Sequence, residues 1–398
     1  MVDTDKPHTD KPRRFFLANN GCERRKLEAQ KTSDYLIANG YVETHTPEDG
    51  DLIVYLSCAA DEKSEVVARA AISQLDRQKS SHAKLVVGGC LPAINPTFLE
   101  GFSDVKTLGP SSMGELDQVL DKVTTPFSKI KEPTRISLPI YAGPKMEESW
   151  DDVALDTGAA VESEAAKRYD AFKRSSDIIR ISHGCLSACS FCAIRTATGT
   201  VISREMGDII AQMTALVRAG HTRFTLTSED TAAYGIDIGC TLTDLLARCA
   251  AISDEVELAV MAANPRWLYK QLDAIERLLA GRSFLRHVVV PVQCASDRLL
   301  RAMNRQHSIA EAVEVFDVFT RAGVEVHTHL IVGFPGETPD ELEEMVAFMK
   351  QHREIDYYLN AFSDRPGTQA HRRTDKLPEA EVQARYQRVM AARMELFV

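Results

Sequence analysis

A CX3CX2C run, formed by Cys185, Cys189 and Cys192, is the feature that most constrains this chain. Fe–S clusters are held by cysteine thiolates, and three thiolates from one loop leave the fourth iron of a [4Fe–4S] cluster open. That open iron can chelate the amino and carboxylate groups of S-adenosylmethionine (SAM). Structural zinc sites usually pair two CXXC arms, which this run does not provide. We therefore predict that these three residues are catalytic and bind a cluster that cleaves SAM to a 5′-deoxyadenosyl radical.

The cysteine run follows the first strand of an alternating series of strands and helices. Expected strands lie at Ile178–Ser182, Arg223–Thr227, Glu257–Met261, Val288–Val292, Glu325–Val332 and Tyr357–Phe362. Expected helices lie between or after them, at roughly 205–219, 241–252, 265–279, 296–304, 308–322 and 339–352. Six units of this kind predict an open, partial (βα)6 barrel, whose carboxyl-terminal mouth would hold the cluster.

The N-terminal part of the chain alternates in the same way and predicts a parallel α/β sheet. Expected strands are Arg14–Ala18, Asp51–Leu56, Lys84–Val87 and Val105–Leu108, and expected helices are Glu23–Ala38, Asp61–Arg77 and Met113–Val123. The predicted fold class is therefore α/β, with an N-terminal parallel sheet domain followed by the partial barrel.

Cys22, Cys58 and Cys90 each follow one of the strands expected in the N-terminal region. The carboxyl ends of parallel strands gather at one edge, so these thiols could converge there and bind a second cluster. Three unrelated buried thiols are the alternative, because free cysteine often packs as a small apolar residue. Glycines directly before Cys22 and Cys90 favour the cluster, since a loop that wraps a ligand needs a permissive backbone.

Five segments are expected along the chain: a disordered N-terminus over 1–12, a cluster-binding sheet domain over 13–125, a linker or flap over 126–175, the barrel over 176–370, and a C-terminal helix over 371–398. Prolines and an acidic run mark the segment 126–175 as irregular. A plain surface connector is the alternative to an active-site flap there.

The composition is typical of a globular protein that resides in the cytoplasm. There is no run of the roughly 18 apolar residues that a membrane helix needs, and the first residues lack the apolar core of a secretory signal. Nine cysteines in such a chain favour metal or catalytic thiols over disulfides. The net charge of −10 argues against a nucleic acid partner, because phosphate binding requires positive charge.

In combination, these segments resemble the methylthiotransferase family of radical SAM enzymes. The resemblance covers about residues 14 to 395 and rests on NNGC, LSCAADEKSE and GGCLPA in the N-terminal region, and on HGCLSACSFCAIR, LTSEDTAAYGID, PVQCASDRLLRAMNR, HLIVGFPGET and AFSDRPGTQAHR in the barrel. It implies two [4Fe–4S] clusters and SAM as cofactors. The cluster at Cys185, Cys189 and Cys192 would generate the radical, and the one at Cys22, Cys58 and Cys90 would supply or carry sulfur.

Several segments depart from the family pattern where substrate and SAM should bind. Glu23-Arg24-Arg25 replaces a usual Gln-Met-Asn, Ser228-Glu229-Asp230 replaces Gly-Gln-Asn/Asp, and Gln293-Cys294-Ala295-Ser296 replaces Gln-Ser-Gly-Ser. The usual Arg-Gly-Arg stretch is also altered, at residues 196–204. In addition, the sequence ends at Val398, where family members continue into a small β-barrel TRAM domain that grips tRNA or a ribosomal protein. We therefore expect a small molecule as substrate.

Five further residues are predicted to bind SAM. Glu229 and Asp230 end the second barrel strand and could hold the SAM amino group or ribose, although a solvated turn is the alternative. Gln293 ends the fourth strand and would face SAM or substrate. The resemblance places Phe191 and the Gly333 turn beside the adenine.

The leading hypothesis is an enzyme that inserts sulfur into a small, nucleoside-like molecule of a natural-product pathway, by thioether formation, methylthiolation or replacement of an oxygen. The alternative is a methylthiotransferase that acts on a tRNA adenosine or a protein side chain. A third possibility, an Fe–S protein that only carries sulfur or electrons, agrees poorly with the complete set of barrel motifs. A flavodoxin- or ferredoxin-type protein is expected to donate the electron.

Overall fold

The computed structural model describes residues 12–102, 104–137 and 163–396. The chain divides into two compact units, one of residues 1–59 and 63–149, the other of residues 60–62 and 150–398. The expected disorder of the N-terminus and most of the acidic stretch near residue 150 fall outside the described residues. Within the described residues, no helix combines the length and the apolar character required to cross a membrane.

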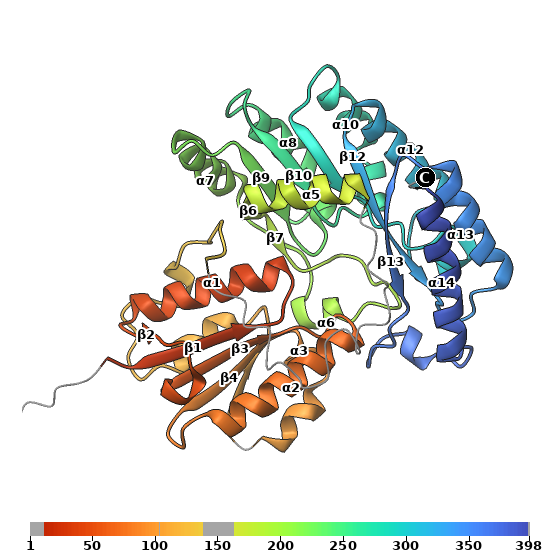
Figure 1. Ribbon diagram of the computed structural model, residues 1–398. Helices are drawn as coiled ribbons and strands as arrows, with labels where there is room; N and C mark the ends of the chain where they lie inside the picture. Colours follow the sequence, from red (N-terminus) through yellow and green to blue (C-terminus); the bar gives the residue numbers. More distant parts are fainter. Residues whose placement is uncertain (1–11, 103, 138–162, 397–398) are drawn as a thin grey trace, which may run out of the picture. The chain divides into compact units, whose positions relative to one another are not determined.

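The first unit is built on a five-stranded sheet with the order β2-β1-β3-β4-β5 (Figure 1). Every neighbouring pair of strands is parallel. The elements, in chain order, are β1 Arg14–Asn19, α1 Glu23–Ala38, β2 Val42–Glu43, η1 Pro47–Asp49, β3 Leu52–Ser57, α2 Glu62–Gln78, β4 Lys84–Gly89, α3 Leu91–Ile94, η2 Pro96–Gly101, β5 Val105–Leu108, η3 Met113–Gln118 and η4 Phe127–Lys129. The four predicted strands are thus confirmed, and the short β2 is added at one edge.

The helix expected over Met113–Val123 is wrong in type and length, because only a 3-10 helix over Met113–Gln118 forms. Gly114 and Asp117 are weak helix formers. The Asp117 carboxylate instead accepts the backbone N–H of Phe127 at 3.0 Å, which fixes the start of η4 rather than extending η3.

The second unit contains a six-stranded parallel sheet in sequence order, β6-β9-β10-β11-β12-β13, as the partial barrel predicts. Its elements are α5 Glu164–Ser175, β6 Asp177–Arg180, β7 Ser182–His183, α6 Ile194–Thr198, β8 Ile202–Ser203, α7 Met206–Arg218, β9 Arg223–Thr227, η5 Thr231–Ala233, α8 Leu242–Ala250, β10 Glu257–Val260, α9 Pro265–Tyr269, α10 Leu272–Leu279, β11 Leu285–Val289, α11 Asp297–Ala302, α12 Ile309–Arg321, β12 Glu325–Val332, α13 Pro339–Gln351, β13 Asp356–Ala361, η6 Ala370–Arg372 and α14 Glu379–Glu395. β7 and β8 form a separate antiparallel pair.

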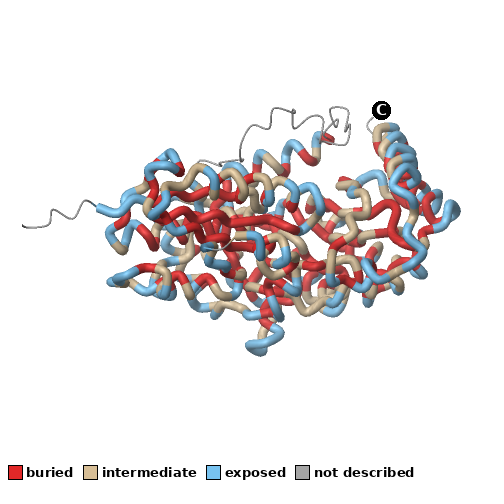
Figure 2. The backbone as a smooth tube through the Cα atoms, turned by 90° about the horizontal axis from the view of Figure 1, so that it is seen from below, coloured by how far each residue is buried: buried red, intermediate tan, exposed pale blue. Residues whose placement is uncertain are grey.

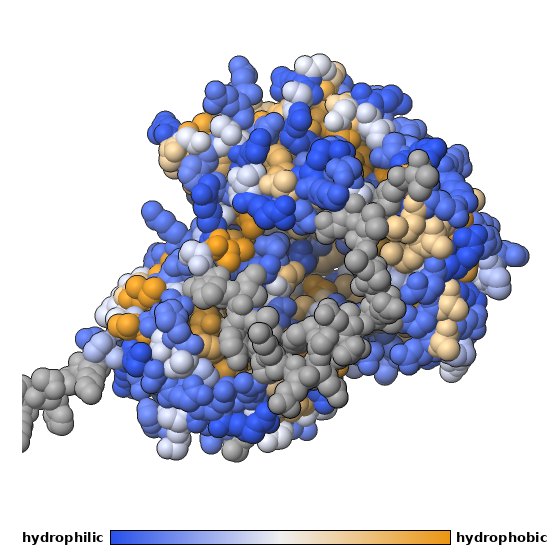
Figure 3. Space-filling view, viewed as in Figure 1, coloured by the Kyte–Doolittle hydropathy of each residue, from blue (hydrophilic) through white to orange (hydrophobic). Residues whose placement is uncertain are grey.

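Each unit has its own apolar core between sheet and helices. In Figure 2 the buried backbone runs through the strands, whereas exposed residues recur along the helices. The helix surfaces on the face drawn in Figure 3 are largely hydrophilic. This contrast explains why short apolar runs were sufficient to locate most strands: a parallel strand covered on both faces reads as a continuous apolar segment.

The fourth barrel strand is displaced from its prediction, at Leu285–Val289 instead of Val288–Val292. Pro291 has no N–H and therefore interrupts the hydrogen-bond ladder. The Thr328 hydroxyl bridges the gap, because it donates to the Val290 carbonyl at 2.7 Å and accepts the Val292 N–H at 3.2 Å. The chain thus stays beside β12 without regular strand pairing.

The segment 126–175, expected to be a linker or flap, ends in a helix. Ser163 caps α5 by accepting the Ala166 N–H at 2.9 Å. Tyr169 and Phe172 of this helix pack with Ala259 and Val289 of the sheet. In Figure 1, α5 crosses one face of the barrel sheet, while α8, α10, α12 and α13 lie on the other. The helix was missed because only one narrow side of it is apolar.

Replacing Thr328 by Val tests the side-chain bridge beside Pro291. The variant keeps the side-chain shape but leaves the buried Val292 N–H without an acceptor, which we expect to cost about 2 kcal/mol. The thermal unfolding midpoint should fall by about 4 to 8 °C. In the control Thr320→Val, the lost hydroxyl donates only to carbonyl groups of α12, such as that of Phe316, so no backbone N–H loses its acceptor. A midpoint for Thr328→Val equal to that of the control would contradict the bridge.

Candidate functional site

The loop that carries Cys185, Cys189 and Cys192 connects β7 to α6 in the second unit. Its entry depends on Gly184, whose φ of +76° and lack of a side chain are both required. A Cβ there would lie 2.0 Å from the Thr200 carbonyl oxygen. The Cys185 N–H then donates to the Gly199 carbonyl at 3.1 Å. The close approach of Gly184 to the backbone at Thr200 therefore fixes the position of Cys185 at the start of the loop.

Two other segments hold the middle of the loop. The Ser190 N–H donates to the Met303 carbonyl at 2.9 Å, and the Ser190 carbonyl accepts the Ala370 N–H at 2.8 Å. The Asn304 side-chain amide donates to the Ala188 carbonyl at 2.7 Å. These bonds restrain the loop from both sides without using the thiols, which leaves the sulfurs available as ligands.

Arg305 also reaches the cysteine loop, and the sequence analysis did not single it out. Its Nη1 lies 3.4 Å from the Cys189 Sγ, and its Nη2 donates to the Pro291 carbonyl at 2.6 Å. The guanidinium is nearly buried. Its position at the end of the PVQCASDRLLRAMNR motif was the available signal. The positive charge of Arg305 lowers the pKa of Cys192, although burial raises that pKa overall.

Two of the loop thiols have raised pKa values. Burial is the main cause for Cys185, whose pKa rises to about 12, and the nearby Asp230 carboxylate raises it further. Burial and the neighbouring Cys189 raise the pKa of Cys192 to about 11. As free thiols these groups therefore stay protonated, and a bound cation must replace the protons for them to act as ligands. Three half-buried thiols in one loop are the donor set that a [4Fe–4S] cluster requires.

Glu229 and Asp230 follow β9 and differ in their surroundings. A Glu229 carboxylate oxygen accepts the Gly184 N–H at 3.0 Å, so this side chain supports the cysteine loop. Asp230 is 2% exposed, and burial raises its pKa to about 6. One of its oxygens accepts the Asn264 N–H, while the other is buried without a hydrogen-bond partner among the described residues. This unpaired oxygen beside Cys185 is suited to a ligand that carries an ammonium or hydroxyl group.

Gln293 lies beyond β11 with φ of +86°, a strained conformation for a residue that has a side chain. Two backbone hydrogen bonds to β12 hold it there, from its N–H to the His329 carbonyl and from the Ile331 N–H to its own carbonyl. Its side-chain amide makes no hydrogen bond among the described residues. The non-glycine residues with positive φ in the described chain are Ala262, Gln293 and Asn304, and all follow strands or helices of this unit.

Gly333 directly follows β12, and its φ is +81°. A Cβ at this position would lie 2.7 Å from a methyl group of Val382 in α14. The Gly333 N–H donates to the buried Glu337 carboxylate, which also pairs with Arg385 of α14 at 3.0 Å. The glycine is therefore explained here by helix packing. Phe191, within the cysteine loop, is half-buried and packs against the barrel core.

The second cysteine triad belongs to the first unit. Cys22 directly precedes α1, Cys58 follows β3, and Cys90 follows β4. Burial raises the pKa of Cys90 to about 12, and the charges of Cys58 and Cys22 add to the rise. Because β1, β3 and β4 are adjacent and parallel, the segments that follow them, and the three cysteines with them, lie at one edge of the sheet.

The loop that carries Cys90 depends on a close approach between β4 and β3. Gly89 has φ of +91°, and a Cβ there would lie 2.3 Å from the Ser57 carbonyl oxygen. The same carbonyl accepts the Cys90 N–H at 2.9 Å. The Cys58 N–H is held by the Asn20 side chain at 2.8 Å. Neighbouring strand ends therefore position these two cysteines together.

Arg25 provides positive charge at this triad. It replaces a residue that is not basic in the family pattern, yet it is only 1% exposed and pairs with the buried Glu28. Desolvation raises the pKa of Cys22, but Arg24, Arg25 and the first N–H groups of α1 lower it to below the usual value. Because Cys22 is exposed to solvent, its desolvation is limited and the positive charges dominate. Cys22 is thus the thiol of this triad most ready to ionise.

Two family models match the chain. The model described as the Radical SAM superfamily matches residues 179–349, and that described as Uncharacterized protein family UPF0004 matches residues 14–108. The first match contains the cysteine loop and the strand ends around it. The second contains all three cysteines of the other triad.

Curated relatives align with nearly the whole chain. A probable threonylcarbamoyladenosine tRNA methylthiotransferase of Pyrococcus horikoshii is 29% identical over 89% of this chain and 78% of its own. The human threonylcarbamoyladenosine tRNA methylthiotransferase is 26% identical over 94% and 61%. A tRNA-2-methylthio-N(6)-dimethylallyladenosine synthase of Anaeromyxobacter dehalogenans is 27% identical over 97% and 80%.

Solved structures share the fold. The radical S-adenosylmethionine methyltransferase TsrM from Kitasatospora setae aligns with a TM-score of 0.60 at 15% identity, over 90% of this chain and 77% of its own. The cobalamin-dependent S-adenosylmethionine radical enzyme OxsB aligns with a TM-score of 0.55 at 12% identity, over 97% and 56%. The predicted fold class is therefore confirmed.

The two family matches, in this order on one chain and together with the relatives that align with nearly the whole chain, show that the chain belongs to the methylthiotransferase-like family of radical SAM enzymes.

Proposed function

We propose that this enzyme attaches a methylthio group to an N6-modified adenosine of tRNA and uses two [4Fe–4S] clusters. The observation that carries the proposal is the pair of cysteine triads, each at the carboxyl ends of parallel strands in its own unit. The names of the aligned relatives support the substrate class, since they all describe modified tRNA adenosines.

Cys185, Cys189 and Cys192 are proposed to hold the radical cluster, and Cys22, Cys58 and Cys90 the auxiliary one. When bound, the clusters and SAM supply the electron, the radical and the sulfur. The protein contributes orientation and charge: Asp230 would receive the SAM amino group or a ribose hydroxyl on its unpaired oxygen, and Glu229 would hold the cysteine loop. Arg305 and Arg25 would stabilise thiolates in the two triads.

The substrate in this proposal differs from the main expectation of the sequence analysis. The net charge and the end of the chain favoured a small nucleoside-like molecule and argued against nucleic acid. The relatives favour the alternative, tRNA, and give no support to a natural-product role. Formal net charge is a property of the entire chain, whereas phosphate binding needs only a local basic surface, so the charge was a weak argument.

Iron content tests the assignment of the two triads. After anaerobic reconstitution, the unaltered protein should carry about eight irons, four for each cluster. Replacing Cys22, Cys58 and Cys90 by Ala should leave about half of the iron and preserve 5′-deoxyadenosine formation. Replacing Cys185, Cys189 and Cys192 should also leave half but abolish SAM cleavage. Unchanged iron in either triple variant would refute that site.

Asp230→Asn tests the proposed SAM contact. The change keeps the side-chain size but removes the charge, so the SAM dissociation constant should rise roughly 10- to 100-fold, corresponding to the 1.5–3 kcal/mol of a charged hydrogen bond. Binding would be measured anaerobically on cluster-loaded protein. Asp244→Asn, at an exposed helix cap, serves as the matched control. Equal SAM affinities for both variants would exclude Asp230 from the SAM site.

The substrate itself can be tested with tRNA that carries threonylcarbamoyladenosine or dimethylallyladenosine. We expect a methylthio nucleoside after digestion and mass spectrometry when reductant and SAM are supplied with a flavodoxin or dithionite. A parallel reaction uses free nucleosides that carry the same modification as the substrate. Conversion of the free nucleoside alone would instead support the small-molecule hypothesis.

A further inference from the structure

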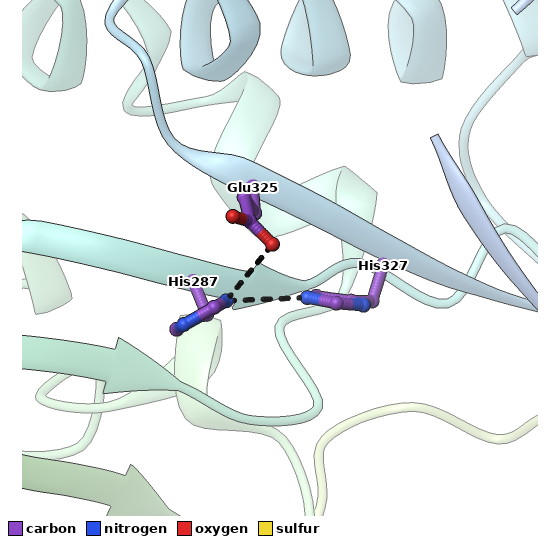
Figure 4. Close-up of side chains that lie close together, drawn as sticks. All are labelled: His287, Glu325 and His327. Atoms are coloured by element: carbon purple, nitrogen blue, oxygen red, sulfur yellow. Dashed lines mark hydrogen bonds and ion pairs between the residues drawn. The ribbon is translucent and has the colours of Figure 1, made fainter. Parts of the chain in front are cut away.

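A second set of metal-binding side chains lies in the second unit, apart from the cysteines. His287 is on β11, and Glu325 and His327 are on β12 (Figure 4). Glu325 and His327 stand two residues apart on their strand and therefore share a face. Glu325 begins β12 and His287 is in the middle of β11, whereas the cysteine loop follows the carboxyl end of β6. The group is thus distinct from the site described above.

The three ligand atoms have the spacing of a single-ion site. The His287 Nδ1 lies 3.4 Å from the His327 Nε2 and 3.7 Å from a carboxylate oxygen of Glu325. All three atoms lie within 4.8 Å of one another. Two nitrogens bound to one tetrahedral zinc ion, each at about 2.1 Å, are about 3.4 Å apart. Among the described residues, no other three side chains of His, Cys, Asp or Glu bring their ligand atoms within 4.8 Å of one another.

The surroundings of His327 orient it as a ligand. It is fully buried, and its Nδ1 lies 3.1 Å from an Asp356 carboxylate oxygen. The other Asp356 oxygen accepts the Ser163 hydroxyl. Because a carboxylate can only accept, the Nδ1 of His327 carries a proton, and the Nε2, which faces His287, is the nitrogen available as a ligand atom. A carboxylate that orients a histidine in this way is the usual outer partner of a metal-bound imidazole.

Glu325 directs one carboxylate oxygen toward the His287 Nδ1 and the His327 Nε2. Its other oxygen accepts a hydrogen bond from Arg168 of α5 at 2.7 Å. The oxygen that faces His287 is buried and has no hydrogen-bond partner among the residues that the structure describes. A buried carboxylate oxygen without a partner is costly unless a cation binds it. The side chain as a whole is 32% exposed, which gives an ion a route from solvent.

His287 is held in place by aromatic contacts. Its ring packs against the edge of Phe172, and Tyr169 stacks on His327 with ring centroids 4.6 Å apart. Burial is the main cause that lowers the pKa of His287 to about 3, and the neighbouring His327 and Arg286 lower it further. Arg168 and Arg393 oppose a cation here, and the Glu325 and Asp356 carboxylates offset them.

We propose that His287, Glu325 and His327 bind a divalent cation of the zinc class, with water as the fourth ligand. Two imidazoles and one carboxylate form a known ligand set for zinc. The ion would join β11 to β12 and, through Arg168 and Asp356, to α5 and β13. It would stabilise this end of the barrel, independently of the tRNA reaction proposed above.

The test uses the full chain with both clusters reconstituted, incubated with one equivalent of Zn²⁺ and desalted. Elemental analysis should find about one zinc per chain with unchanged iron. Zinc-edge X-ray absorption should show only nitrogen and oxygen neighbours, at about 2.0–2.1 Å, and no sulfur at about 2.3 Å. Retained zinc that is bound to sulfur, or no retained zinc, would overturn the proposal.

Matched variants locate the ion. Glu325→Gln should lower bound zinc at least tenfold, whereas Glu257→Gln should not, although Glu257 also begins a barrel strand, has the same 32% exposure and pairs with Arg223. Asp356→Asn, which leaves all three ligands in place, should weaken zinc binding about 10- to 100-fold. Zinc should raise the unfolding temperature of the unaltered protein but not of Glu325→Gln. Equal zinc in the two glutamate variants would contradict the site.

Discussion

The parallel direction of all strands within each main sheet is the constraint on which both cysteine sites depend. In the first unit, β1, β3 and β4 are adjacent, and a cysteine follows each of them. In the second unit, the cysteine loop, Asp230, Gln293 and Gly333 each follow the carboxyl end of a successive or nearby strand. One strand running the other way would remove its contribution from the shared edge. Strand direction therefore brings together the cysteines of the first unit and the residues around the cysteine loop of the second, whereas the three cysteines of that loop are already close in sequence.

Close backbone contacts convert this arrangement into defined loops. Gly184 and Gly89 each approach a carbonyl oxygen of a neighbouring segment so closely that a Cβ cannot fit. Gln293 adopts a left-handed conformation despite its side chain, held by two hydrogen bonds to β12. The left-handed conformation costs about 1–3 kcal/mol for a residue that has a side chain, such as Gln293, and persists only where the surroundings impose it. Gly184 adopts it without that cost at the entry of the cysteine loop.

The barrel interior is polar at the end near α5, which is unusual for a sheet covered on both faces. The inner face of β12 carries Glu325 and His327, while Val326 between them packs into the apolar core on the outer face. Buried polar groups are tolerated when paired, and Asp356 contacts His327, Ser163 and Arg393. The aromatic side of α5 closes this network from solvent. A cation would complete the network at the buried Glu325 oxygen, which has no hydrogen-bond partner within the described part of the chain.

The sequence by itself determined the six cysteines, the order of strands and helices, and the family. These features are local: apolar runs mark covered parallel strands, and a CX3CX2C run is complete within one loop. Tertiary structure alone decided where Pro291 displaces β11, that residues 164–175 form a helix, and that Arg25 and Arg305 are buried beside thiols. It also brought His287 together with His327, which is 40 residues away in the chain. Such pairs depend on strand register and on which face each side chain takes, and neither is encoded in the spacing of the residues involved.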